Sequence, residues 1–259
     1  MEPTTDAPAI LTERHGSVLV ITINRPQVRN AIDGAAAHGI AAAIDELDGD
    51  DSLSAGVLTG AGGFFCAGMD LGAFARGDAP WIEGRGFAGI TQRASVKPLI
   101  AAIEGFAVAG GLEIALSCDL IVAAAGAKLG IPETKRSLVA AGGGLLRLPR
   151  RMPYHLVMEL ALTGDPMPAE RFHAFGVVNR VADPGEALTV ALELAATLAK
   201  NGPLALVASK RIVQEQQDWS LEEMWLKQAE IAGPVLMSAD AREGAVAFKE
   251  KREPVWTSS

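Results

Sequence analysis

The chain has 259 residues, of which 49% are hydrophobic and 21% charged, and its formal net charge is −8. This length can bury a full-sized core, and the composition excludes disordered, collagen-like and disulfide-stapled classes. With 31 acidic residues against 23 basic ones and no long basic run, nucleic acid is not an expected partner.

The N-terminal segment and the cysteine usage indicate the compartment. Residues 1–16 carry acids and prolines where a secretion signal has a basic start and an apolar run. Cys66 and Cys118 could form at most one disulfide, which is typical of a reducing compartment. We therefore expect a cytoplasmic protein.

The first third of the chain predicts a strand, a helix and a second strand. Residues 17–23 are rich in β-branched side chains, and Pro26 ends this strand because proline donates no backbone hydrogen bond. Residues 31–48 are rich in alanine and carry apolar side chains at helical spacing. Residues 55–59 predict a short strand that ends in the glycines of residues 60–63, where a flexible backbone suits a loop that approaches a ligand.

The same order repeats in the middle of the chain. It comprises a strand at 99–103, a glycine-bearing loop at 105–111, a helix at 112–117 and a strand at 120–124. Three acidic residues interrupt this apolar stretch, and each would cost about 2.5 to 3.5 kcal/mol at the centre of a bilayer, so we expect no membrane contact. Successive units of this kind stack on a common core, which predicts an α/β fold and leaves open whether the sheet is doubly wound or spiral.

The second half of the chain is mostly helical by its pattern. From residue 154 onward one short strand is predicted, at 177–181, and the segment from residue 198 predicts helices alone. The apolar stripes of this segment, such as Leu221 and Trp225, are typical of a core or of a subunit contact.

Several motifs for cofactors are incomplete. Gly60-x-Gly62 lacks the third glycine and the later acid of a dinucleotide site, and Gly105 and Gly110 are not followed by the lysine of a phosphate loop. The four histidines and two cysteines have no metal-ligand spacing. Cys66 has no histidine near it in sequence, so a packed thiol is favoured over a nucleophile. We expect no metal and no separate cofactor.

Three longer segments carry a more specific signal. They are FFCAGMDL at 64–71, AVAGGLEIALSCDL at 107–120 and LGIPETKRSLVAAGGGLLRLPR at 129–150, preceded by NRP at 24–26 and followed by EKR at 250–252. Together they resemble the signature blocks of the crotonase (enoyl-CoA hydratase/isomerase) superfamily, and the resemblance covers essentially the whole chain.

This resemblance implies a fold and an assembly. Residues 1–197 would form a spiral of repeated ββα units that holds the coenzyme A and acyl sites. Residues 198–259 would form a helical C-terminal region through which the protein assembles as a homotrimer or a dimer of trimers.

The resemblance also implies an oxyanion hole for the thioester carbonyl, formed by the backbone N–H groups of Met69 and Gly110. Physical chemistry supports this independently, because Gly110 precedes a short predicted helix whose first N–H groups have no partner within the helix. One such donor to a developing enolate oxygen contributes about 3 to 4 kcal/mol.

Glu113 and Glu133 lie 20 residues apart, the separation that the hydratase branch uses for its two catalytic carboxylates. Hydration needs a base that activates water for attack at Cβ and an acid that protonates Cα. By resemblance, Glu113 is assigned to the water and Glu133 to the Cα proton, although the two could share these tasks. The simpler alternative is that each glutamate stabilises the first turn of a helix.

Other residues are implied only by the resemblance to contact the acyl-CoA thioester substrate, of which coenzyme A is a part. These residues are Arg25, Ala67, Asp70, Leu71, Ala141, Phe248 and Lys251, the last two reaching the coenzyme from a neighbouring subunit. Lys251 could equally belong to a solvated surface.

The chain departs from the usual hydratase pattern after Glu133. It has Arg136-Ser137 and Ala140-Ala141 where Leu-Gly and Pro-Gly are usual, so the acyl pocket need not take a simple straight-chain substrate. Ala109 replaces the first glycine of the usual triplet, a change that we expect to preserve the loop.

We therefore predict an enoyl-CoA hydratase, with three alternatives. An enoyl-CoA isomerase can work with the Glu133-type residue alone, so the presence of Glu113 argues against it. A carnitinyl-CoA dehydratase-like lyase is indicated by GFAGIT at 86–91 and by the ending AFKEKREPVW. A non-catalytic acyl-CoA-binding subunit is the alternative of another class.

Overall fold

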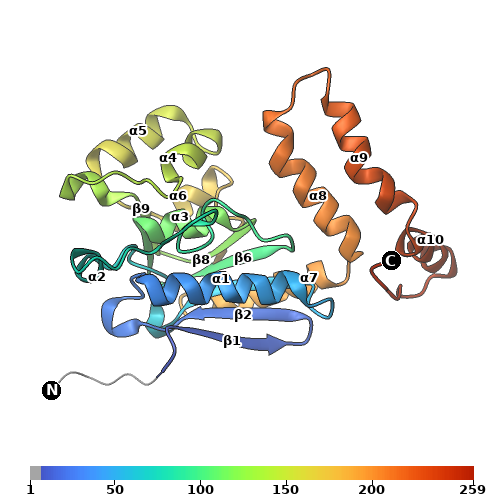
Figure 1. Ribbon diagram of the computed structural model, residues 1–259, viewed down its shortest axis with the longest axis horizontal. Coiled ribbons are helices and arrows are strands. Elements are labelled where there is room, and N and C mark those ends of the chain that lie inside the picture. Colours follow the sequence, from blue (N-terminus) through green and yellow to red (C-terminus); the bar gives the residue numbers. More distant parts are fainter. Residues whose placement is uncertain (1–6) are drawn as a thin grey trace.

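The computed structural model describes residues 7–259, and its core is built on a six-stranded sheet (Figure 1). The strand order is β1 (Ile10–His15), β2 (Val18–Ile23), β3 (Ala55–Gly60), β6 (Leu99–Ile103), β8 (Leu120–Ala124) and β11 (Arg180–Ala182). β1 runs antiparallel to β2, and every other neighbouring pair is parallel.

The parallel strands are apolar because helices cover them. All five residues of β6 are buried, and so are the first five of β3. Helix α1 (Gly34–Gly49) packs on β1 and β2, while α7 (Ala187–Ala199) packs across β3, β6 and β8. A sheet covered in this way favours continuous runs of Val, Ile, Leu and Ala over alternation.

A second, smaller sheet makes the fold a spiral. It contains β10 (Met167–Pro168), β9 (Lys128–Gly130) and β7 (Phe106–Val108). β6 lies in the large sheet, β7 lies in the small one, and helix α3 (Gly110–Ser117) follows β7. In the same way, β8 lies in the large sheet and β9 in the small one. This alternation confirms the predicted spiral of ββα units.

The remaining elements are short and connect the sheets or surround the small one. Strands β4 and β5 pair with each other, and the others are helices of one to three turns. They are β4 (Trp81–Ile82), β5 (Gly86–Phe87), α2 (Leu71–Ala75), α4 (Gly144–Arg147), α5 (Tyr154–Thr163), α6 (Ala169–Ala174), and the 3-10 helices Pro26–Val28, Ala61–Gly63, Pro132–Arg136, Leu148–Arg150 and Gln216–Asp218.

The strands and helices predicted in the first half of the chain are confirmed to within three residues, but the strands β1, β4, β5, β7 and β9 were missed. β1 has one half-buried and five exposed residues, so it carries no apolar run. β7 is three residues long and lies inside the predicted glycine loop. The strand expected at 177–181 begins only at Arg180, because Val177 and Val178 are buried in the connection after α6.

The last helices project from the core (Figure 1). They are α8 (Pro203–Glu215), α9 (Met224–Leu236) and α10 (Ala239–Glu250), and α8 packs mainly against α9. No single helix in residues 7–259 has the length and hydropathy to cross a membrane. One pair of helices in the described part of the chain, α7 joined to Pro203–Asp218, meets that requirement together, and this pair is bent by 109°.

Lys210 connects helix α8 to the core through an ion pair and two hydrogen bonds. Its side chain is 9% exposed, and its ammonium lies 2.6 Å from Asp119 Oδ2. It also donates to Ser95 Oγ at 2.9 Å and to the Lys97 carbonyl at 2.8 Å. Asp119 in turn accepts from the Leu99 N–H at 2.8 Å, so one buried ion pair connects α8, β6 and the end of α3.

We predict that Lys210→Met lowers the free energy of unfolding by about 3 kcal/mol, because it leaves the Asp119 carboxylate buried without its cation. The matched control is Lys227→Met, which removes an exposed pair with Glu223 at 3.4 Å and should change the stability by less than about 0.5 kcal/mol. Urea unfolding at one protein concentration measures both. Equal small effects would contradict the role given to Lys210.

Candidate active site

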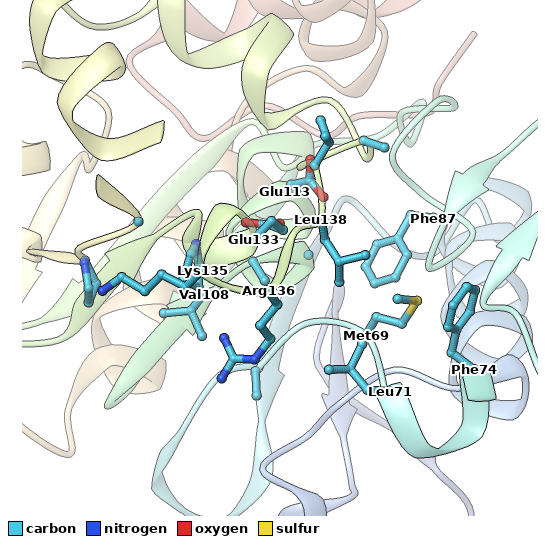
Figure 2. Close-up of a pocket in the computed structure, with 18 of the residues that line it drawn as sticks. Met69, Leu71, Phe74, Phe87, Val108, Glu113, Glu133, Lys135, Arg136 and Leu138 are labelled. Carbon is cyan, nitrogen blue, oxygen red and sulfur yellow. The ribbon is translucent and has the colours of Figure 1, made fainter. Parts of the chain in front are cut away.

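A cavity of about 640 Å³ opens between the small sheet, the loop before α2 and the segment after β9. Glu113, Glu133, Met69 and Gly110 all line it, so the fold brings together the four residues that were predicted to carry the chemistry. Figure 2 shows the two glutamates close to each other, with Met69 and Phe87 on the same side of the cavity.

Glu113 lies in the first turn of α3 and is 3% exposed. Its Oε1 accepts a hydrogen bond from the Gly144 N–H at 2.9 Å. Burial raises the pKa of Glu113, while the N–H groups of Gly144 and Gly142 and the nearby Arg147 guanidinium act in the opposite direction. The carboxyl group is thus buried but supplied with donors that favour its charged form.

Glu133 has a different environment. It follows Pro132 in a 3-10 helix, and its Oε2 is buried with no hydrogen-bond partner among the described residues. Burial, and then the charge of Glu113, raise the pKa of Glu133 to about 7. Two carboxyl groups in one cavity therefore differ in their affinity for a proton, which is the property that separates an acid from a base.

The backbone N–H groups of Met69 and Gly110 donate no hydrogen bond within the described residues. Gly110 is the first residue of α3, so its N–H has no acceptor inside the helix. The two loops approach so closely that a Cβ on Gly68 would lie 3.0 Å from the Gly110 nitrogen. Two free donors thus face one cavity, as an oxyanion hole requires.

Ala109 holds the loop before α3 in a conformation that favours glycine. Its φ is 54° and its ψ is −132°, and a residue with a Cβ is strained there by about 1 to 3 kcal/mol. The Ala109 N–H donates to the Gly130 carbonyl at 2.9 Å, which ties the loop to β9. The predicted loop is present. Its backbone is strained at Ala109, which the replacement of the usual glycine by alanine did not by itself indicate.

Aromatic and aliphatic side chains that the sequence analysis did not single out form much of the wall. Trp81 and Phe87 pair edge to face with ring centroids 5.1 Å apart, because β4 and β5 place them opposite each other. Phe74, Leu138 and Val139 also line the cavity. These residues come from short elements without helical or strand periodicity, so hydropathy alone could not assign them to a site.

Basic side chains also line the cavity. They are Arg29, Lys128, Lys135 and Arg136, and all four residues are exposed. Lys135 also forms an ion pair with Asp165. Their positive charges would attract a polyanionic ligand. Within residues 7–259, no group of three His, Cys, Asp or Glu side chains is placed to hold a metal ion.

The residues expected to border coenzyme A divide into two groups. Ala67, Leu71 and Ala141 line the cavity. Arg25 and Asp70 do not: the guanidinium lies 3.0 Å from Asp70 Oδ2 and 2.7 Å from Asp33 Oδ2. Both aspartates cap helices, Asp33 at the start of α1 and Asp70 at the start of α2. Their contact with the coenzyme stays a prediction.

Phe248 and Lys251 lie at the end of α10, away from the core (Figure 1). Phe248 is 86% exposed, and neither residue lines the cavity of its own chain. Their predicted contact comes from a neighbouring subunit, and it too stays a prediction.

The buried Glu113 and the half-buried Glu133 lie beside two free backbone donors, an arrangement that can serve acid/base chemistry on a substrate that develops charge on an oxygen. The family model for enoyl-CoA hydratase/isomerase matches residues 13–259. The chain therefore belongs to the enoyl-CoA hydratase/isomerase family, which confirms the resemblance to the crotonase superfamily.

Individual relatives match along almost the full length. The enoyl-CoA hydratase EchA19 of Mycobacterium tuberculosis is 42% identical over 254 residues, 95% of this chain and 96% of the relative. A carnitinyl-CoA dehydratase of Salmonella arizonae is 42% identical over 251 residues, covering 94% and 96%. A crystal structure of an enoyl-CoA hydratase from Mycobacterium tuberculosis has a TM-score of 0.96 at 56% identity, covering 98% of this chain and 100% of that one.

We predict that Ala109→Gly raises the free energy of unfolding by about 1 kcal/mol, because relief of the strained φ outweighs the extra chain entropy of glycine. The control is Ala125→Gly, at a position whose φ is not positive, where glycine should not stabilise. Chemical unfolding of both variants measures the difference. A loss of stability in Ala109→Gly would show that the loop is not strained.

Proposed function

We propose that the protein is a lyase that adds water reversibly to a trans-2-enoyl-CoA and gives the 3-hydroxyacyl-CoA. The observation that carries this proposal is the pair of carboxyl groups, Glu113 and Glu133, in one cavity with the free N–H groups of Met69 and Gly110. Coenzyme A is part of the substrate, and no separate cofactor is required.

In this proposal the ionised Glu113 takes a proton from water as the water oxygen bonds to Cβ. The π electrons move onto the thioester oxygen, where the N–H groups of Met69 and Gly110 stabilise the enolate. Protonated Glu133 then gives its proton to Cα. Transfer of a proton from Glu113 back to Glu133 restores the enzyme, so one water is added and no electrons are gained or lost. The raised pKa of Glu133, to about 7, supports this division because it keeps a proton available near neutral pH.

The cavity also supports the substrate class. The basic residues Arg29, Lys128, Lys135 and Arg136 suit the phosphate groups of coenzyme A, and the apolar wall suits an acyl chain. An isomerase needs one carboxyl group, and an idle binding subunit needs neither, so burial of two acids at a cost in desolvation favours the hydratase.

A second candidate is a lyase that dehydrates carnitinyl-CoA. Its specific support is the aromatic group formed by Phe74, Trp81 and Phe87, because the faces of aromatic rings attract quaternary ammonium groups. Relatives at 42% identity that are named carnitinyl-CoA dehydratase favour the same candidate.

We further propose that the protein assembles as a trimer or a dimer of trimers in the cytoplasm. The projecting helices and the turn before α9 expose large apolar side chains, including Leu221 at 85%, Trp225 at 69% and Leu236 at 74%, which supports association through this region. Both cysteines are free and buried, which suits a reducing compartment.

We predict that Glu113→Gln and Glu133→Gln each lower kcat for hydration by about 100- to 10,000-fold, because each removes one proton-transfer group. Loss of enoyl-thioester absorbance with crotonyl-CoA and longer or branched analogues measures the reaction. In the parent, kcat/KM should fall as pH rises through about 7, where Glu133 loses its proton, and Glu133→Gln should lack this fall.

Carnitinyl-CoA, assayed in the dehydration direction, distinguishes the second candidate. A shift of the double bond without water addition would instead identify an isomerase. Binding of the thioesters without any turnover would contradict both lyase proposals.

A further inference from the structure

Arg147 contacts the loop that holds Glu113, although it does not line the acyl-CoA cavity. It is the last residue of α4, three residues after Gly144, whose N–H donates to Glu113 Oε1 at 2.9 Å. The Arg147 side chain folds back over this loop: Nη1 donates to the Gly142 carbonyl at 3.3 Å. Nη2 donates to the Thr91 carbonyl at 2.6 Å.

The loop leaves little room for side chains larger than glycine. Gly143 has a φ of 101°, and a Cβ on it would lie 2.1 Å from Arg147 Nη1. A Cβ on Gly142 would lie 2.6 Å from Glu113 Oε2. The guanidinium and the Glu113 carboxyl therefore contact the same short segment of backbone, residues 142–144.

We propose that Arg147 is a positioning residue for the hydration reaction: its guanidinium holds residues 142–144 in the conformation in which their N–H groups bind Glu113. Through Thr91 it also ties this loop to the segment that carries Phe87, one wall of the cavity. The inference rests on the proposed hydratase function.

The charge of Arg147 acts on Glu113 as well. Burial raises the pKa of Glu113 and the charge of Arg147 lowers it, while Glu113 in turn raises the pKa of Glu133. Burial and the charge of Arg151 lower the pKa of Arg147, whereas Glu113 and Cys118 raise it. Removal of the guanidinium should thus raise the pKa of Glu113, and the base would become ionised only at higher pH.

The test compares three variants of the full-length enzyme over pH. Arg147→Met should lower kcat for hydration by about 10- to 100-fold with KM changed less than about twofold, as expected when positioning rather than binding is lost. The acidic limb of the profile should move to higher pH, because the positive charge of Arg147 lowers the pKa of Glu113 in the parent. Arg147→Lys retains the cation, so its limb should stay near that of the parent.

Arg151→Met is the matched control. Arg151 is an arginine four residues after Arg147 and donates to the Leu116 carbonyl at 3.0 Å, but it makes no hydrogen bond to residues 142–144. Its kcat and acidic limb should remain those of the parent. If Arg147→Met does not fold, Arg147→Gln, which lacks the charge but retains one donor, carries the same expectation.

An unshifted acidic limb in the folded neutral variant, or equal changes in Arg147→Met and Arg151→Met, would overturn the inference. The proposed function would still stand in either case, because the parent would remain active. An inactive parent with enoyl thioesters would instead overturn the proposed function itself.

Discussion

Two carboxyl groups share one cavity, and the cost of removing both from water governs the rest of the site. An isolated buried carboxylate is strongly disfavoured unless hydrogen bonds or a cation compensate. The structure supplies Glu113 with compensation from Gly144, Gly142 and the guanidinium of Arg147, whereas Glu133 has only a backbone N–H of its own. Glu133 receives no partner for Oε2, so it retains a proton more readily. The difference between the two carboxyl groups follows from where the backbone donors lie.

Those donors are available only because the backbone approaches so closely. A Cβ added to Gly142 would lie 2.6 Å from the Glu113 side chain, and a Cβ added to Gly144 would lie 3.2 Å from it. On the other side of the cavity, Gly68 lets the loop of Met69 reach the start of α3, where Ala109 accepts a strained φ. The spiral of ββα units brings these loops together because β7 and β9 lie side by side in the small sheet. The fold can thus form this site because these positions carry glycine or alanine, whose side chains are absent or small.

The sequence predicted most of the core and seven residues of the cavity, for different physical reasons. β2, β6 and β8 are covered by the fold, so their continuous apolar runs are visible in the sequence, whereas the exposed β1 has no such run. The signature segments located Glu113, Glu133, Met69 and Gly110. They could not show that Arg147 folds back onto its own loop, since a basic residue beside Arg150 and Arg151 has the pattern of a solvated surface. Nor could they separate Ala67, which lines the cavity, from Arg25, whose guanidinium pairs with two capping aspartates.

Hydration by this site requires that the thioester oxygen bind between two backbone donors while both acids face the reacting carbons. A crystal structure with a saturated acyl-CoA, which cannot be hydrated, tests this most directly. We expect the thioester oxygen about 2.7 to 3.1 Å from the nitrogens of Met69 and Gly110, with Glu113 toward Cβ and Glu133 toward Cα. A thioester oxygen bound elsewhere, or carboxyl groups turned away from the acyl carbons, would contradict it.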